Sequence, residues 1–371
     1  MFFKWRFRGR ALAGAAGVLV SLAAIASAQG SLPVIDAPPS APPPVQRLAY
    51  VTGTIKSPSA VWVAQPSGAE PKRLGPGDSP LLAPDGQLVA ASLFGATGDS
   101  EGGPSIAIYS AVGAPTNEYL NLATATATPL AWSPDSRYLA LSLMSTAVHN
   151  IAKQSGLAVI DTQTGTVTTI MHGQINGASF APDGSDRLIF GRAPSLSVNA
   201  PSNLYVSQPN GGELKPLTHD GRSLNPIWGP SYIAFDRERL RKNYAPIFQI
   251  WLTSLAGGGA RRLTNMHVDK LVVGLVPLAF SSSGAGLLAE FEGQDTSEAW
   301  TLGIPAGHPR RLTLHGQSVV GAGLSQDGTT VLIDAQDFEG PPSGGLIASM
   351  PFGGGPATTL VAHGSQASWN R

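Results

Sequence analysis

The chain has 371 residues, of which 44 are Gly and 31 are Pro, so turn-forming residues are abundant and long helices are disfavoured. Charged residues make up only 13% and hydrophobic residues 42%, a composition that supplies a large core and excludes intrinsic disorder. The formal net charge is zero, but residues 1–28 hold four basic residues and no acid, so the rest of the chain has 20 basic and 24 acidic residues, which argues against a nucleic-acid partner. The lack of Cys excludes disulfides, Cys-ligated metals and thiol catalysis.

The N-terminus has the pattern of a secretory signal peptide. Basic residues between Lys4 and Arg10 precede the apolar run 11–28, which ends in Ala26-Ser27-Ala28. We therefore expect a bacterial protein exported to the periplasm or the extracellular medium and cleaved after Ala28, with an uncleaved membrane anchor as the alternative. No later segment is long enough to span a membrane as an apolar helix. The predicted domains are a signal peptide (1–28), a Pro-rich linker (29–46) and a folded domain (47–371).

A short turn between two apolar segments recurs about every 48 residues along the folded domain. Pro and Asp-Gly favour a tight reversal, so each copy predicts a strand, a turn and a second strand. The turns are centred on Pro84-Asp85-Gly86, Pro134-Asp135-Ser136, Pro182-Asp183-Gly184, Gly229-Pro230-Ser231, Ser282-Ser283-Gly284 and Gln326-Asp327-Gly328.

Two further apolar segments follow each turn and predict a third and a fourth strand. The third strands are centred on Trp62, Ala107, Ala158, Tyr205, Trp251, Trp300 and Ile347. The fourth strands end in segments such as Lys72-Arg73-Leu74, Arg261-Arg262-Leu263-Thr264 and Arg310-Arg311-Leu312-Thr313. Four short strands per repeat predict one antiparallel blade of a β-propeller.

The two ends of the domain predict how the array closes. There are seven third strands but only six complete turn-bearing repeats, and residues 366–369 match a first strand while residues 48–51 match a second strand. We expect these segments to pair and complete one blade, because an open array would expose free sheet edges. The predicted fold is an all-β, seven-bladed propeller, with six blades as the alternative.

These repeats resemble those of a known family. The segments Trp132-Ser133-Pro134-Asp135-Ser136 and Phe180-Ala181-Pro182-Asp183-Gly184, together with the two Arg-Arg-Leu-Thr segments, are similar to the WD40-like (PD40) repeats of the TolB-like β-propeller family. The resemblance covers about residues 47–371 and implies a propeller in the cell envelope. Similar repeats form the propellers of prolyl-oligopeptidase-type peptidases; neither the additional α/β domain of TolB nor the peptidases' hydrolase domain is expected in this chain.

Most familiar enzyme signatures are absent from the sequence. It contains no phosphate-binding G-x-x-x-x-G-K-[ST] loop, no H-E-x-x-H segment and no EF-hand spacing. The segment Gly98-Asp99-Ser100-Glu101-Gly102 matches G-x-S-x-G in letters and lies in the predicted connection 94–105. A central channel would be lined by the starts of the first strands, and these contain one carboxylate, Asp78, among fourteen residues. Paired-carboxylate chemistry or a metal centre is therefore disfavoured there, and no cofactor or metal is predicted.

Recognition is expected on the face that carries the longer connections, because rigid scaffolds place binding residues in such loops. The segment Arg237–Pro246 is the most cationic of these predicted loops. Arg and Tyr are enriched at interaction hot spots. The candidate partner-binding residues are Arg237, Arg239, Arg241, Lys242 and Tyr244.

Five histidines recur after the fourth strands at a spacing of 47 or 48 residues. They are predicted to serve loop packing at the rim, and a surface binding role is the alternative. The five are His172, His219, His267, His315 and His363.

The function predicted from the sequence is a non-enzymatic scaffold for a protein or peptide partner in the cell envelope. The alternative is an extracytoplasmic propeller enzyme or a carbohydrate-binding protein that acts on cell-wall or plant polysaccharide. Trp62, Trp251 and Trp300 could stack on sugars, but their repeat positions favour blade cores.

Overall fold

The computed structural model describes residues 45–54, 57–93, 105–112, 118–120, 125–145, 155–197, 200–241, 244–266, 274–293, 296–305, 308–314, 317–325, 327–335 and 345–370. This part of the chain consists of strands, turns and irregular segments without any helix, so the all-β expectation is confirmed for it. The described residues therefore contain no helix long and apolar enough to cross a membrane. The predicted signal peptide and most of the linker lie outside the described residues.

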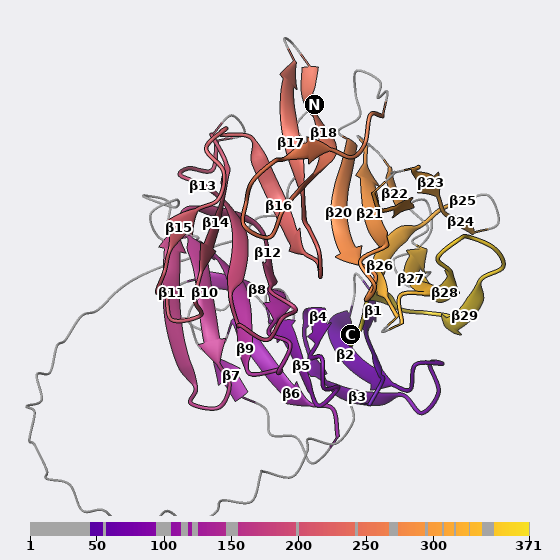
Figure 1. The fold of residues 1–371 in the computed structure, drawn as a ribbon. Helices are drawn as coiled ribbons and strands as arrows, with labels where there is room; N and C mark the ends of the chain where they lie inside the picture. Colours follow the sequence, from indigo (N-terminus) through magenta and orange to yellow (C-terminus); the bar gives the residue numbers. More distant parts are fainter. Residues whose placement is uncertain are drawn as a thin grey trace, which may run out of the picture.

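Most strands pair in four-stranded antiparallel sheets in which each strand lies beside the next one along the chain. Figure 1 shows these sheets arranged around a common centre. The first three sheets after the N-terminal strands are β4 (Asp78–Leu82), β5 (Leu88–Ser92), β6 (Ile106–Ser110) and β7 (Glu118–Leu120); β8 (Ala125–Trp132), β9 (Tyr138–Ser145), β10 (Gly156–Asp161) and β11 (Thr166–His172); and β12 (Gln174–Phe180), β13 (Leu188–Ala193), β14 (Asn203–Ser207) and β15 (Lys215–Pro216).

The next two groups of strands are joined into one larger sheet by a single parallel bridge between Phe248 and Gly274. A separate two-stranded hairpin and another four-stranded sheet follow. The strands are β16 (Ser223–Trp228), β17 (Ile233–Arg241), β18 (Tyr244–Thr253) and β19 (Arg261–Arg262); β20 (Gly274–Phe280), β21 (Gly286–Glu292), β22 (Ser297–Gly303) and β23 (Arg310–Arg311); β24 (Thr313–Leu314) and β25 (Gln317–Ser318); and β26 (Val320–Leu324), β27 (Thr330–Ala335), β28 (Leu346–Pro351) and β29 (Thr358–Val361).

The last sheet combines both ends of the described chain. It contains β1 (Leu48–Thr54), β2 (Ser57–Ala64), β3 (Lys72–Pro76) and β30 (Ser365–Trp369), in the order β3-β2-β1-β30. β30 runs antiparallel to β1, with Leu48 opposite Trp369 and Ala49 opposite Ser368. The segments that the sequence predicts to pair are therefore neighbours in the structure.

Side-chain hydrogen bonds explain why the recurring turns form where the sequence places them. In the β8–β9 turn, the Ser133 hydroxyl donates to Asp135 and accepts the Tyr138 amide at 2.8 Å. The β26–β27 turn repeats the arrangement, with the Ser325 hydroxyl donating to Asp327 and accepting the Thr330 amide at 3.0 Å. Such local bonds give the backbone an alternative to continuing the strand, so Ser-x-Asp fixes the reversal.

The core is divided into clusters that lie between neighbouring sheets. Val61 of β2 packs with Val89 of β5, for example, and Phe235 of β17 packs with Ile189 of β13. Another cluster joins Leu48 of β1 to Leu332 of β27, so the sheet that holds both chain ends also packs against the last sheet before it. Burial of apolar surface between sheets is the main force that holds such an array together.

Candidate partner-binding face

The β17–β18 hairpin differs most from the sequence prediction. Arg237–Pro246 is predicted as a long loop, but β17 continues for nine residues to Arg241 and β18 begins at Tyr244 and runs for ten. Arg239 lies opposite Ile247 and Arg241 opposite Tyr244, so the segment is a strand pair rather than a loop. Cross-strand hydrogen bonds satisfy the backbone N–H and C=O groups of the paired strands, which explains why a charged segment can stay ordered beyond the sheet. Figure 1 shows this hairpin projecting beyond the other strands.

Arg237 is held in place by neighbours on β17, on β18 and in the connection before β16. Its guanidinium lies 2.7 Å from an Asp220 carboxylate oxygen, and its central carbon lies 4.2 Å from the centre of the Trp251 ring and 5.3 Å from that of Phe235. Its Nε atom is buried without a hydrogen-bond partner. Cation–π contact and an ion pair together restrict this side chain, so Arg237 supports the base of the hairpin instead of offering a free cation.

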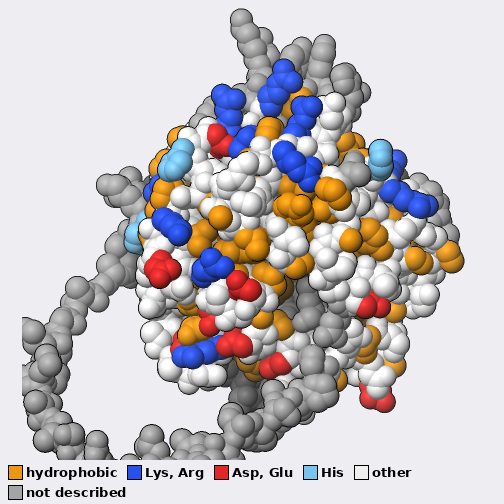
Figure 2. Space-filling view, viewed as in Figure 1, with side chains coloured by type: hydrophobic (Ala, Val, Ile, Leu, Met, Phe, Trp, Pro, Cys, Tyr) orange, Lys and Arg blue, Asp and Glu red, His pale blue; other side chains and the backbone are white. Residues whose placement is uncertain are grey.

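Arg239 is the candidate residue that the structure leaves exposed on this hairpin. The backbones of Arg241 and Tyr244 form the end of the strand pair, while their side chains and the whole of Lys242 lie outside the described residues. Figure 2 shows Lys and Arg side chains at the end of the molecule from which β17 and β18 project. The partner-binding role of all five residues stays a prediction.

A bulge in the first strand recurs close to the centre of the molecule. The pairing of first and second strands shifts at Asn176–Ala178, at Leu224–Ile227 and at Gly321–Gly323, among other sheets. Bulges re-aim side chains and are common at functional sites. Asn225 and Gln366 have φ values of 43° and 53° in these bulges, a left-handed conformation that is uncommon outside Gly.

One of these bulges connects three sheets by hydrogen bonds. The Gln366 amide donates to Asp334 at 2.6 Å, and the Gln366 side-chain oxygen accepts the Ser79 amide at 2.6 Å. β30 is thereby tied to β27 on one side and to β4 on the other, so the centre of this face is a fixed surface rather than a set of free loops.

Three carboxylates next to the bulges, two of them buried and one half-buried, were not predicted from the sequence. Asp236, Glu290 and Asp334 stand at equivalent positions in the second strands β17, β21 and β27, each opposite the start of a first strand. The starts of the first strands, from which the channel lining was predicted, contain only the carboxylate of Asp78. The signal was an acid after three apolar residues in each strand, as in Ile233-Ala234-Phe235-Asp236.

Burial makes two of these groups easy to protonate. Asp236 has no exposed surface and neither of its oxygens has a well-formed hydrogen bond, although Asn225 lies beside it. Loss of solvation raises the pKa of Asp236 to about 8. Burial, with a contribution from Glu292, raises the pKa of Glu290 to about 7. Among the described residues, no three His, Cys, Asp or Glu side chains form a metal-binding group. At neutral pH Asp236 and Glu290 therefore hold a proton more readily than ordinary carboxyl groups.

Three of the repeated histidines are among the described residues, at or just after the fourth strands. His172 ends β11, His219 follows β15 and His363 precedes β30, and all three are exposed. The carbonyl of His172 accepts a hydrogen bond from Arg192 at 2.8 Å. His267 and His315 lie outside the described residues.

The tryptophans named as possible sugar platforms are half-buried and pack against the cores. Trp62 stacks on Tyr50 and donates a hydrogen bond to Thr52 at 2.8 Å. Trp251 lies under Arg237, and Trp300 donates to Glu298 at 3.2 Å. Each therefore has a packing role.

Comparison with solved structures identifies the fold. No family model and no curated protein matches the chain. TolB from Acinetobacter baumannii is similar with a TM-score of 0.52 and 17% identity over 87% of this chain and 66% of that one. Prolyl oligopeptidase B from Galerina marginata is similar with a TM-score of 0.58 and 15% identity over 88% of this chain and 52% of that one.

A third similar structure consists of a propeller domain alone. The β-propeller domain of the Trilobed protease from Pyrococcus furiosus has a TM-score of 0.52 and 14% identity over 76% of this chain and 84% of that one. That domain has an open velcro topology, whereas here β30 pairs with β1.

The architecture and these similarities define the chain as a β-propeller. Its fold is like that of TolB, and at these identities the similarity concerns the fold alone. The chain spans about two thirds of the length of that TolB and about half that of the prolyl oligopeptidase.

Proposed function

We propose that the chain is an exported, TolB-like β-propeller that binds a protein or peptide partner in the cell envelope and does not catalyse a reaction. The observation that carries the proposal is the β17–β18 hairpin, which extends past its sheet and presents Arg239 to solvent above the fixed Arg237. Preorganised strands lose little entropy on binding, and exposed Arg is a frequent anchor at protein interfaces.

The blade number belongs to the same proposal. We infer seven blades, the last formed by β30 with β1, β2 and β3. Supporting this, hydrophobic clusters lie between each pair of consecutive sheets among the described residues, and the cluster around Leu48 and Leu332 joins the last sheet to the first. Such a ring leaves no free sheet edge at its joint.

Export is inferred from the residues 1–28 and is consistent with the fold similarity to TolB. N-terminal sequencing of the protein from cell fractions tests it. A mature chain that begins at Gln29 is expected, and an intact Met1 in the membrane fraction would instead indicate an anchor.

The partner-binding face is tested by site-specific photo-crosslinking in cells. A photoreactive residue at position 239 is expected to give a discrete adduct of higher mass. The matched control is position 213, an exposed residue in the β14–β15 turn on the opposite face. Adducts at position 213 with none at 239 would place the binding surface on the other side.

Substitution then measures the contribution of the anchor. With the crosslinked partner in hand, Arg239→Ala is expected to weaken binding by about fivefold or more, which corresponds to about 1 kcal/mol. Because Arg239 is exposed, the melting temperature should remain that of the wild type.

Similarity to a prolyl oligopeptidase supports an enzymatic alternative, in which the propeller is one part of a peptidase system. Peptidase activity of the purified chain toward Pro-containing peptides would favour it. Unchanged peptide in that assay, together with an adduct at position 239, is the result that our proposal expects.

A further inference from the structure

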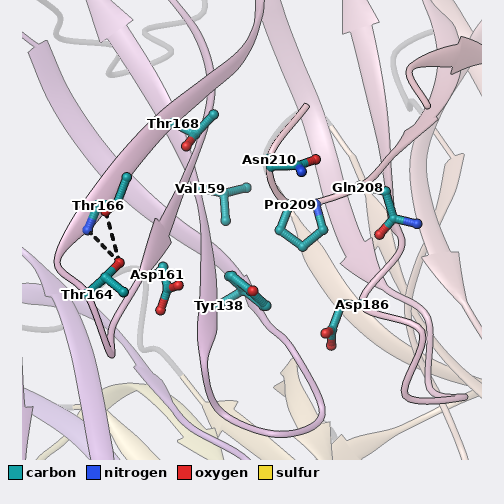
Figure 3. Close-up of a pocket in the computed structure, with 10 residues that line it drawn as sticks. All are labelled: Tyr138, Val159, Asp161, Thr164, Thr166, Thr168, Asp186, Gln208, Pro209 and Asn210. Carbon is teal, nitrogen blue, oxygen red and sulfur yellow. Dashed lines mark hydrogen bonds between the residues drawn. The ribbon is translucent and has the colours of Figure 1, made fainter. Parts of the chain in front are cut away.

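A cavity of about 380 Å³ lies on the face opposite the β17–β18 hairpin, between two neighbouring sheets. One wall comes from the β10–β11 hairpin, with Thr164, Thr166 and Thr168, and the other from the β14–β15 turn, with Gln208, Pro209 and Asn210 (Figure 3). Sites for small ligands start at about 300 Å³, so the volume suits a small molecule.

Tyr138, Asp161 and Asp186 lie between these walls, and Figure 3 shows the Tyr138 ring between the two acids. The two carboxylates differ in their hydrogen-bond partners. Asp161 accepts hydrogen bonds from Arg137 through both carboxylate oxygens, with a shortest distance of 2.7 Å, and also accepts the Gln163 amide. The same guanidinium lies 4.8 Å from the centre of the Tyr138 ring. The charge of Asp161 is therefore neutralised within the protein.

Asp186 is half-buried and has no hydrogen-bond donor among the described residues. Burial raises its pKa, and the nearby Asp135 adds to that effect. Hydroxyl donors from a ligand would stabilise its charged form, because hydrogen bonds to carboxylates are stronger than those between neutral groups. The Asp186 carboxylate is therefore the strongest hydrogen-bond acceptor that the cavity offers to a ligand.

The remaining polar groups offer both donors and acceptors. The Asn210 side-chain oxygen accepts the Gly212 amide at 2.9 Å, which leaves its NH₂ group for a ligand. The Thr164 hydroxyl donates to Thr166, so the Thr166 hydroxyl keeps its own proton available. A ligand that fills this cavity must therefore both give and accept several hydrogen bonds.

The charges that line the cavity indicate which class of ligand it can bind. An anion would meet the unpaired Asp186, while a cation would leave the Asn210 and Thr donors unmatched. A neutral molecule with several adjacent hydroxyl groups satisfies both sets. We propose that this cavity is a binding site for a neutral saccharide, with Asp186 accepting hydrogen bonds from two of its hydroxyls and Gln208 and Asn210 holding the opposite edge.

The proposal is independent of the partner-binding face, because the two sites lie at opposite ends of the strands. Saturation-transfer NMR and calorimetry with D-glucose, D-galactose, D-mannose, N-acetyl-D-glucosamine and cellobiose as probes test it on the full chain. Glucuronate serves as the anionic probe and lysine amide as the cationic one. We expect binding of at least one neutral probe, weaker binding of glucuronate and none of lysine amide.

Asp186→Asn is the decisive variant. Asp186 has a φ of 54°, and Asn tolerates this left-handed conformation well, so the variant should fold normally. Loss of the charged acceptor is expected to weaken saccharide binding by about tenfold. Glu213→Gln in the same β14–β15 turn is the matched control, since Glu213 is exposed and does not line the cavity, and it should leave the affinity unchanged.

Three results would overturn the proposal. The first is that none of the neutral probes binds. The second is an equal affinity in Asp186→Asn and wild type, with both proteins showing the same melting temperature. The third is binding of lysine amide that Asp186→Asn abolishes, which would assign the cavity to a cation.

Discussion

Asp236 and Arg237 are neighbours in β17 but point to opposite environments. Successive residues of a strand face opposite sides. Asp236 enters the interior, where no exposed surface remains, whereas Arg237 turns outward to Trp251 and Asp220. A buried carboxylate without a partner is costly when charged, so the fold holds Asp236 with a proton bound at neutral pH. Burial of Asp236 therefore destabilises the folded state mainly in alkaline solution, where the carboxyl group would lose its proton.

The protonated state of Asp236 predicts how stability changes with pH. Its pKa is about 8 in the folded chain and about 4 when unfolded, so the folded state binds the additional proton between these values. Stability from this group is complete below about pH 4 and is lost as the pH rises through about 8. Urea unfolding from pH 5 to pH 9 should show a falling free energy of unfolding, with up to about 1.4 kcal/mol per pH unit from one proton.

Asp236→Asn removes this proton and should flatten the profile. Glu290 contributes in the same direction because its pKa is also raised, so some slope should remain. Asp327→Asn is the control. Hydrogen bonds from Ser325 and Thr329 lower the pKa of Asp327, so this group changes stability only at acidic pH, below the range of the titration. An identical slope in Asp236→Asn and wild type would show that Asp236 is ionised in the fold.

At the scale of elements, β30 replaces a covalent turn by hydrogen bonds. In the other sheets a short turn joins the first strand to the second, but β30 and β1 come from distant parts of the chain. Asn370, directly after β30, accepts the Arg47 amide at 2.7 Å and donates to the carbonyls of Val45 at 2.9 Å and Pro84 at 3.1 Å. Ser368 also accepts the Leu82 amide at 3.2 Å. These hydrogen bonds hold β30 beside β1, as a covalent turn holds the first and second strands together in the other sheets.

Asn370→Ala should therefore destabilise the protein more than an ordinary surface substitution. The side chain is 3% exposed and its loss leaves three backbone groups without their partner. We expect a decrease of about 1 to 3 kcal/mol in the free energy of unfolding, measured by urea titration. Asn210→Ala, in an exposed turn, is the control and should cost much less. Equal effects of the two would mean that the joint is held by β30 pairing alone.

For the whole molecule, stability comes from the interfaces between sheets rather than from each sheet by itself. The clusters combine residues of two sheets, as in Val159 of β10 with Phe190 of β13. An isolated sheet of this size would leave one such surface exposed to water, so neighbouring sheets stabilise each other. The joint at β30 contributes to two interfaces, through Ala367 and through the bonds to Leu82 and Pro84.

A circular permutant tests whether the joint is equivalent to the other turns. Linking Asn370 to Val45 by a short linker and opening the chain in the exposed Gly258–Gly259 turn should preserve the melting temperature. In this permutant Asn370→Ala should cost less than in the native order, because the linker now holds the strands together. An unchanged cost would indicate that Asn370 acts on the β4 sheet through Pro84 instead.

The sequence predicted features that depend on neighbouring residues in the chain. Pro84-Asp85-Gly86 and Ser133-Pro134-Asp135 mark turns because their own atoms set the backbone, and the third strands follow from local apolar runs. It did not predict the carboxylate of Asp236 in the interior, because that depends on how β16 bulges beside it. The cavity beside Tyr138 could not be predicted either, since it depends on the relative position of two turns in different sheets.

The pairing of β30 with β1 also has a consequence during synthesis on the ribosome. Arg47 and Asn370 are separated by 323 positions, so the first strand is made long before its neighbour exists. At about 5 to 20 residues per second, β1 waits roughly 15 to 65 s with an unpaired edge. Unpaired edges recruit other strands and promote aggregation. Because we propose that the chain is exported, its strands stay unpaired until translocation. Production of this protein should therefore depend on a chaperone that shields nascent β-strands, and slowing translation should lower the soluble yield.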